Sequence, residues 1–233
     1  MILAGDVMKS VVLTGFSRGL GASLFQNLIG LEGVRLFAMG RIGSEKVQQT
    51  VYSFLPWDLE KPEDAPSVES IVAGGGDSLT FINNAGTVEP IGDIGELSEE
   101  DLRKAAQINF VSPMLFCNQL VGLCRKKRQK LKIINISTGA ANYPIVGWSA
   151  YCSTKAAFKM FLDVLAEQEK DGGCGVEVVH VDPGVMDTGM QEKIRAADAK
   201  SFPRLAEFQA LKAEGKLRRP EEVAENIIRK YIL

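Results

Sequence analysis

Tyr151 and Lys155 are the residues of this sequence whose types and spacing most directly indicate chemistry. They lie four positions apart, so on a helix they share one face and can touch. A phenol gives up its proton near pH ~10, and a lysine ammonium within about 5 Å stabilises the phenolate and lowers that value. A cationic nicotinamide ring would lower it further. We therefore interpret the pair as a tyrosine acid/base tuned by a lysine beside a hydride-carrying cofactor, although most pairs of this spacing are solvated surface neighbours.

The elements that must position this pair begin with an apolar strand. The segment 133–136 precedes two adjacent hydroxyl residues, Ser137 and Thr138, and the first helical turn that carries Tyr151 follows. Successive strand residues face opposite sides of a sheet, so only one of the two hydroxyls can face the tyrosine.

A glycine-rich turn near the N-terminus joins a predicted strand, 10–14, to a predicted helix over 22–33. Its glycines are Gly15, Gly19 and Gly21, a spacing that differs from the usual GxGxxG. Glycines let the backbone approach a pyrophosphate, which then rests on the helix N-terminus. We predict a dinucleotide-binding loop; the alternative is a glycine-rich turn without a ligand.

The residues after the second predicted strand, 34–39, indicate which dinucleotide binds. Sites specific for NAD place an Asp or Glu about 20 residues past the loop to bind the ribose 2′-hydroxyl. The window LFAMGR contains no acid but contains Arg41, and Arg18 lies within the glycine loop. Two guanidinium groups suit a 2′-phosphate, so NADP(H) is the predicted cofactor.

Three further predicted strands end in residues suited to a ligand. Asp58, after strand 51–55, either accepts a hydrogen bond from an adenine amino group or caps the next element. Strand 78–82 ends in small and amide residues at 83–86, and ligands bind at the carboxyl ends of strands in open parallel sheets. Thr188, beyond strand 176–181, is placed to bind a cofactor amide or phosphate, to form the N-cap of the following helix, or to do both.

The alternation of about six strands with helices predicts the fold. A long helix should begin at an N-cap at Ser98 and end in the basic run 125–132, whose cations suit a helix C-terminus better than an address signal or nucleic acid. The helix of Tyr151 should stop at 171–173, and the last helix should begin at Pro220. We predict a single α/β domain over 1–233, a doubly wound (Rossmann) parallel sheet with helices on both faces, with 187–219 as a substrate lid.

Composition excludes several classes of protein. The 233 residues are 45% hydrophobic and 24% charged with a net charge of −2, which argues against nucleic acid as a partner. No apolar window is long enough to cross a membrane, and the acid-bearing N-terminus is unlike a secretory signal. The four cysteines lack CxxC spacing, and the single histidine, His180, lies in an apolar strand. We expect reduced thiols, a cytoplasmic location, and neither a metal site nor a serine–histidine–aspartate triad.

Five motifs occur in the order and spacing of one family: TGFSRGLG, NNAG, Asn109 in a long helix, the Tyr-xxx-Lys pair and PGVMDT. With them the chain resembles the short-chain dehydrogenase/reductases over nearly its whole length. Two segments, GWSAYCSTKAA and DPGVMDTGMQ, are similar to sepiapterin reductase and more closely to bacterial benzil reductases, which reduce one carbonyl of a 1,2-diketone.

The resemblance implies a role for each matching residue. Tyr151 would be the general acid, Lys155 would lower its pKa and bind the nicotinamide ribose, and Asn109 would hold a water that links Lys155 to solvent. The substrate-orienting hydroxyl usually lies 13 residues before the tyrosine, at Thr138, with Ser137 as the fallback. The implied cofactor contacts are Gly15, Ser17, Arg18, Gly19, Leu20, Gly21, Asn84, Ala85, Gly86, Pro183, Gly184, Val185 and Thr188, to which we add Arg41, Asp58 and Leu59.

We therefore predict an NADPH-dependent carbonyl reductase acting on a small molecule, in particular one carbonyl of a 1,2-dicarbonyl. The predicted pocket wall is Tyr143, Trp148, Met190 and Phe202. The alternative is a non-catalytic NADP(H)-binding regulator on the same fold. The family also implies a homodimer or homotetramer built through the two long helices. It usually adds a seventh strand after the last helix, so we expect either a sheet of six strands or a chain cut short.

Overall fold

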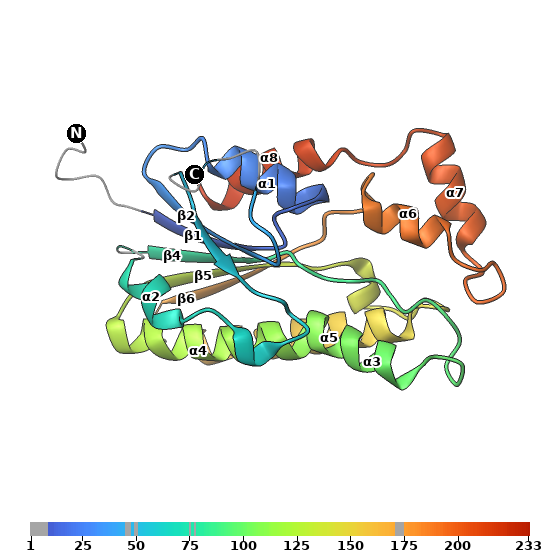
Figure 1. The fold of residues 1–233 in the computed structure, drawn as a ribbon, viewed down its shortest axis with the longest axis horizontal. Coiled ribbons are helices and arrows are strands. Elements are labelled where there is room, and N and C mark those ends of the chain that lie inside the picture. Colours follow the sequence, from blue (N-terminus) through green and yellow to red (C-terminus); the bar gives the residue numbers. More distant parts are fainter. Residues whose placement is uncertain (1–8, 45–47, 49–50, 75, 77, 171–174) are drawn as a thin grey trace.

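Six parallel strands form the centre of the molecule within the described residues, in the order β3-β2-β1-β4-β5-β6 (Figure 1). The computed structural model describes residues 9–44, 48, 51–74, 76, 78–170 and 175–233. The predicted helix stop at 171–173 and Cys174 lie outside them. The strands are β1 (Lys9–Thr14), β2 (Val34–Gly40), β3 (Ser53–Pro56), β4 (Ser78–Asn83), β5 (Lys130–Ile136) and β6 (Val176–Val181).

Helices cover both faces of this sheet, as predicted (Figure 1). On one face lie α1 (Gly19–Leu28) and α8 (Pro220–Tyr231). On the other face lie α2 (Val68–Ala73), α4 (Ser112–Lys127) and α5 (Ser149–Lys170), and α3 (Glu99–Ala106) precedes α4. Single turns occur at η1 (Pro62–Asp64), η2 (Gln107–Val111) and η3 (Gly139–Ala141).

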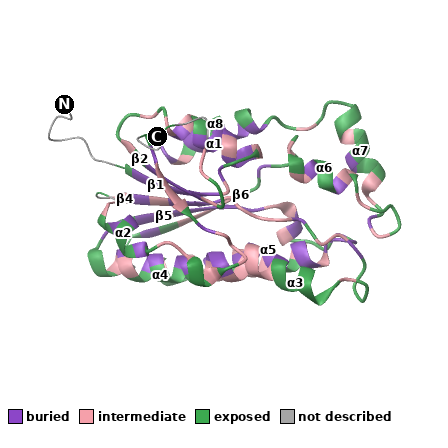
Figure 2. Ribbon diagram, in the orientation of Figure 1, coloured by how far each residue is buried: buried purple, intermediate pink, exposed green. Residues whose placement is uncertain are grey.

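The two-residue period of the strands gives each face its own core. Val12, Phe37 and Phe81 point toward α4 and α5, whereas Leu13 and Leu36 point toward α1 and α8. Each of these side chains is buried. Because the central strands are buried on both faces, they are apolar almost throughout, which is typical of parallel sheets (Figure 2).

Two predicted helices differ from those observed: the helix expected over 22–33 is α1, which spans Gly19–Leu28, and the long helix expected from Ser98 differs in its end and in its continuity. The helix expected to run through 132 ends at Lys127, because Arg128 adopts a left-handed conformation with φ of 54° and Gln129 donates to the Cys124 carbonyl. Leu131 therefore belongs to β5, where it pairs with Leu79. The same long helix is also interrupted, because 107–111 form a π-helical turn between α3 and α4.

The predicted lid contains two helices, α6 (Gly189–Arg195) and α7 (Leu205–Ala213), beyond the carboxyl end of the sheet (Figure 1). They close a third apolar cluster, which includes Trp148, Tyr151, Ile194 and Phe208. In the part of the chain that the structure describes, no helix combines the length and apolarity needed to cross a membrane.

Candidate active site

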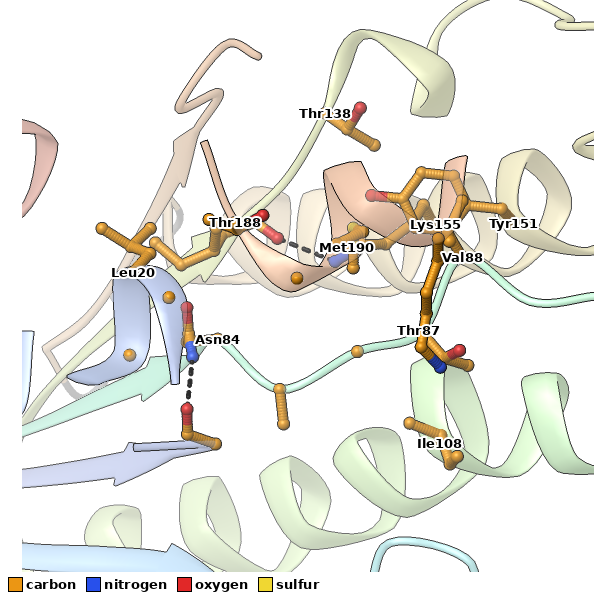
Figure 3. A pocket seen from close by; sticks show the side chains of 18 of the residues that line it. Leu20, Asn84, Thr87, Val88, Ile108, Thr138, Tyr151, Lys155, Thr188 and Met190 are labelled. Carbon is orange, nitrogen blue, oxygen red and sulfur yellow. Dashed lines mark hydrogen bonds between the residues drawn. The ribbon is translucent and has the colours of Figure 1, made fainter. Parts of the chain in front are cut away.

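A cavity of about 670 Å³ opens where the strands end, between the glycine loop and the lid (Figure 3). Every residue predicted to contact a cofactor lines it, and so do Ser137, Thr138, Tyr151 and Lys155. Strand ends far apart in the sequence therefore meet at one cavity, as the rule for ligand sites in open parallel sheets requires.

The glycine loop is shaped for close approach of a ligand. Gly15 has a φ of 70°, and a Cβ there would lie 2.9 Å from the Cα of Ala85. A Cβ at Gly21 would overlap the Gly15 carbonyl and lie 2.5 Å from the Asn84 side-chain nitrogen. Larger residues would not fit at these two positions, so the glycines let the loop pack tightly against the end of β4. The N-terminus of α1 begins in this loop, and Gly15, Gly19 and Gly21 line the cavity, so the residues present fit a dinucleotide pyrophosphate.

Thr14, which sequence reasoning left unassigned, ties this loop to the end of β4. Its hydroxyl accepts from the backbone nitrogens of Asn84 at 3.0 Å and Ala85 at 3.1 Å. The Asn84 side chain in turn donates to the carbonyls of Thr14 at 3.0 Å and Gly15 at 3.1 Å. The only signal in the sequence was a hydroxyl at the end of a buried strand.

Tyr151 lies in the first turn of α5, buried to 7% exposure. Burial raises its pKa to about 12, and the Asp182 carboxylate acts in the same direction, whereas a hydrogen bond with Thr138 opposes them. The predicted lowering of this pKa is therefore wrong for the protein chain alone, because desolvation of the phenolate dominates. Of the two candidate hydroxyls, Thr138 is the one that interacts with the phenol; the backbone nitrogen of Ser137 donates to Val181 at 2.8 Å.

Lys155 lies one helical turn further along α5 (Figure 3). Its ammonium donates to the carbonyl of Ile136 at 2.8 Å, and its side chain is buried. Burial lowers its pKa to about 8, because a charged ammonium loses its hydration there. The lysine is thus still mostly protonated at neutral pH.

Asn109 lies in the π-helical turn, and both the oxygen and the nitrogen of its side chain make hydrogen bonds within the protein. Its oxygen accepts from the backbone nitrogen of Thr87 at 2.9 Å, and its nitrogen donates to the Thr87 carbonyl at 2.8 Å. The same nitrogen donates to the hydroxyl of Thr154 at 3.2 Å. Asn109 therefore fixes the segment after β4 against α5, and the water link to Lys155 stays a prediction.

Charged side chains gather at the opposite end of the cavity. Arg18 and Arg41 line it there, and Asp58 accepts from the backbone nitrogen of Glu60 at 3.2 Å. Asp58 therefore caps its own turn while also lining the cavity. Lys104 of α3, which the sequence did not indicate, reaches over to Glu60 at 2.9 Å.

Three of the four residues predicted for the wall of the substrate pocket line the cavity, and the fourth does not. Tyr143, Trp148 and Met190 line the cavity, whereas Phe202 is fully buried behind Trp148, on which it stacks with centroids 5.1 Å apart. Packing across the lid decides this position, and a single sequence carries no signal for it. The lining residues that the sequence did not indicate include the apolar side chains of Val88, Ile145, Ile194 and Phe208.

The structure also locates Thr188 and His180, two single side chains that the sequence singled out. Thr188 occupies the N-cap position of α6, but its side chain makes no cap hydrogen bond and instead packs toward Gly19. His180 lies in β6 away from the cavity, as predicted, and contacts Asn135 at 3.1 Å and Asp163 at 3.0 Å. Burial lowers its pKa, against the effect of Asp163.

Comparisons with a family model, with curated proteins and with solved structures agree on one family of oxidoreductases. The family model described as short chain dehydrogenase matches residues 9–199. A benzil reductase ((S)-benzoin forming) of Bacillus cereus is 33% identical over 94% of this chain and 92% of its own length. Sepiapterin reductase of Xenopus tropicalis is 30% identical over 84% of this chain and 80% of its own. The crystal structure of the KRED1-Pglu enzyme matches with a TM-score of 0.81 and 27% identity, covering 97% of this chain and 96% of its own.

Proposed function

Because the chain belongs to the short chain dehydrogenase family, we propose that it is an NADPH-dependent carbonyl reductase that uses Tyr151 as its general acid. The observation that carries this proposal is the meeting of Tyr151, Thr138 and Lys155 in one cavity with the glycine loop. Hydride and proton donors must both reach one carbonyl group, and a shared cavity permits this.

The protonation state of Tyr151 suits the role of general acid. With its pKa raised to about 12, Tyr151 holds its proton at neutral pH and can donate it to a carbonyl oxygen. A reduced nicotinamide, when bound, supplies a hydride for the carbonyl carbon. Thr138 and Tyr151 polarise the carbonyl oxygen by hydrogen bonding, and the ammonium of Lys155 stabilises the phenolate that remains.

The preference for NADP(H) rests on Arg18 and Arg41. Both line the cavity at the end away from Tyr151, in positions from which guanidinium groups would hold a 2′-phosphate by charge-assisted hydrogen bonds. The cradle around Gly15 and Gly21 would hold the pyrophosphate.

The substrate would bind beneath α6 and α7, which we assign as the lid. Met190 and Ile194 of α6 and Phe208 of α7 line the cavity there, and an ion pair joins Lys193 of the lid to Glu89 on the opposite wall. These mostly apolar walls suit an aromatic ketone. The names of the benzil and sepiapterin reductases among the relatives favour a 1,2-dicarbonyl.

Assembly through the two long helices has support from their outer surfaces. Leu115 of α4 and Met160 and Val164 of α5 are large apolar side chains with 43%, 62% and 51% exposure. A homodimer or homotetramer would cover them.

The decisive experiment measures oxidation of NADPH and NADH with aromatic ketones, using the unmodified protein and Tyr151→Phe. We expect turnover with NADPH in the unmodified protein, no turnover in the variant, and nearly equal NADPH affinity in both. Full turnover by Tyr151→Phe would refute the assigned general acid. Tight NADPH binding without turnover of any carbonyl compound would favour the non-catalytic regulator.

A further inference from the structure

Tyr143 places a second phenol at the reacting end of the cavity. It lies between η3 and α5, lines the cavity and is 56% exposed, unlike Tyr151, which is buried. Its side chain is therefore within reach of a molecule that enters the cavity. A tyrosine hydroxyl both donates and accepts hydrogen bonds.

Gly139 provides the seat for this phenol. A Cβ at Gly139 would collide with the hydroxyl oxygen of Tyr143 and would lie 2.9 Å from its ring carbon Cζ. The hydroxyl thus rests directly on the backbone of the residue that follows Thr138. Thr138 interacts with Tyr151, so the seat of the Tyr143 phenol adjoins the residue that contacts the proposed general acid.

The other unsatisfied donors near the cavity are less suitable. Trp148 Nε1 and Gln191 Nε2 are without hydrogen-bond partners in the described part of the chain, but both nitrogens are shielded from solvent. A ligand could meet them only after their side chains moved. The hydroxyl of Tyr143 needs no such movement, because its side chain is already exposed.

We infer that the Tyr143 hydroxyl donates a hydrogen bond to the second, non-reacting oxygen of a 1,2-dicarbonyl substrate. This inference rests on the proposed function, in which Tyr151 and Thr138 bind the reacting oxygen. The two oxygens of a 1,2-dicarbonyl are attached to adjacent carbons, so a donor that rests on Gly139, the residue next to Thr138, suits the second of them. A site with such a donor favours diketones over monoketones, which leave the hydroxyl without its partner.

The test compares an aryl 1,2-diketone with the matched monoketone in which a methylene replaces the second carbonyl. We expect Tyr143→Phe to lower kcat/KM for the diketone about tenfold and to change the monoketone value less than about twofold, which matches the loss of one neutral hydrogen bond. Gly139→Ala should displace the phenol and give the same selective loss. The double variant should lose no more than either single variant, because both changes remove one interaction.

Tyr231→Phe is the matched control, because this tyrosine lies on α8 and does not line the cavity. It should leave kcat/KM for both ketones unchanged. The urea unfolding midpoint of Tyr143→Phe should equal that of the unmodified protein. An equal loss for both ketones in Tyr143→Phe, or no loss for either, would overturn the inference. Reduction of the monoketone without reduction of the diketone by the unmodified protein would overturn it too, while leaving the general carbonyl reductase assignment intact.

Discussion

Replacing Lys155 with methionine should stabilise the protein at neutral pH while removing its activity. The Lys155 ammonium is buried, and its pKa falls from 10.5 to about 8 on folding because burial penalises the charge. Between these two values the unfolded chain binds a proton that the folded chain has released. The free energy of unfolding therefore rises with pH across this window, and below about pH 8 the lysine carries its full destabilising effect.

The size of this effect follows from the two pKa values. The difference between 10.5 and about 8 corresponds to about 3 kcal/mol at pH 7, of which about 2 kcal/mol is recovered by about pH 9.5. The substitution also removes the 2.8 Å hydrogen bond to the Ile136 carbonyl, which costs about 1–2 kcal/mol. The Lys155→Met variant should thus be more stable by about 1–2 kcal/mol at pH 7.

Urea unfolding of both proteins at about pH 7 and about pH 9.5 measures this effect, provided their m-values agree. The stability advantage of the variant should shrink by about 2 kcal/mol at the higher pH. A Lys155→Arg variant keeps its charge throughout this range, so it should lack the increase in stability that the unmodified protein gains. A difference between the unmodified protein and Lys155→Met that is the same at both pH values would refute the buried, titrating lysine.

Two further changes test the cofactor end of the cavity and the packing behind its lid. Arg41→Ser should reduce kcat/KM for NADPH by about 10- to 100-fold, because it removes charge-assisted hydrogen bonds to the 2′-phosphate. The value of kcat/KM for NADH should stay within about twofold. An equal loss for both cofactors would contradict the assigned role of Arg41. Phe202→Ala should lower the free energy of unfolding by about 3–5 kcal/mol, because the ring is fully buried against Trp148. Urea unfolding measures this loss, and a change below about 1 kcal/mol would place the ring outside the core.

The fold and the cofactor side of the site could be predicted because their signals are local. The glycine loop lies between a strand and a helix that are adjacent in the sequence, and Tyr151 and Lys155 share a helix face through their spacing. Strand ends at one edge of a parallel sheet then bring Asn84 and Thr138 to the same cavity without further information.

The remaining features depend on contacts between distant segments. The position of Phe202 is decided by Trp148 and Phe208, which the lid brings against it. The direction of the pKa shift of Tyr151 depends on how deeply its ring is buried, and sequence spacing does not report burial. The link between Asn109 and Thr87 requires the π-helical turn, which has no strong signal in a single sequence.

The hydrogen bonds that join Thr14 to Asn84 and Ala85 have a thermodynamic consequence for ligand entry. They are made entirely within the chain, so the loop holds its shape through bonds between its own side chains and backbone. A dinucleotide that enters such a loop has little backbone freedom to restrict, and the entropy lost on association is correspondingly small. The folding of the chain has already ordered this end of the sheet, so more of the interaction energy is expressed as affinity.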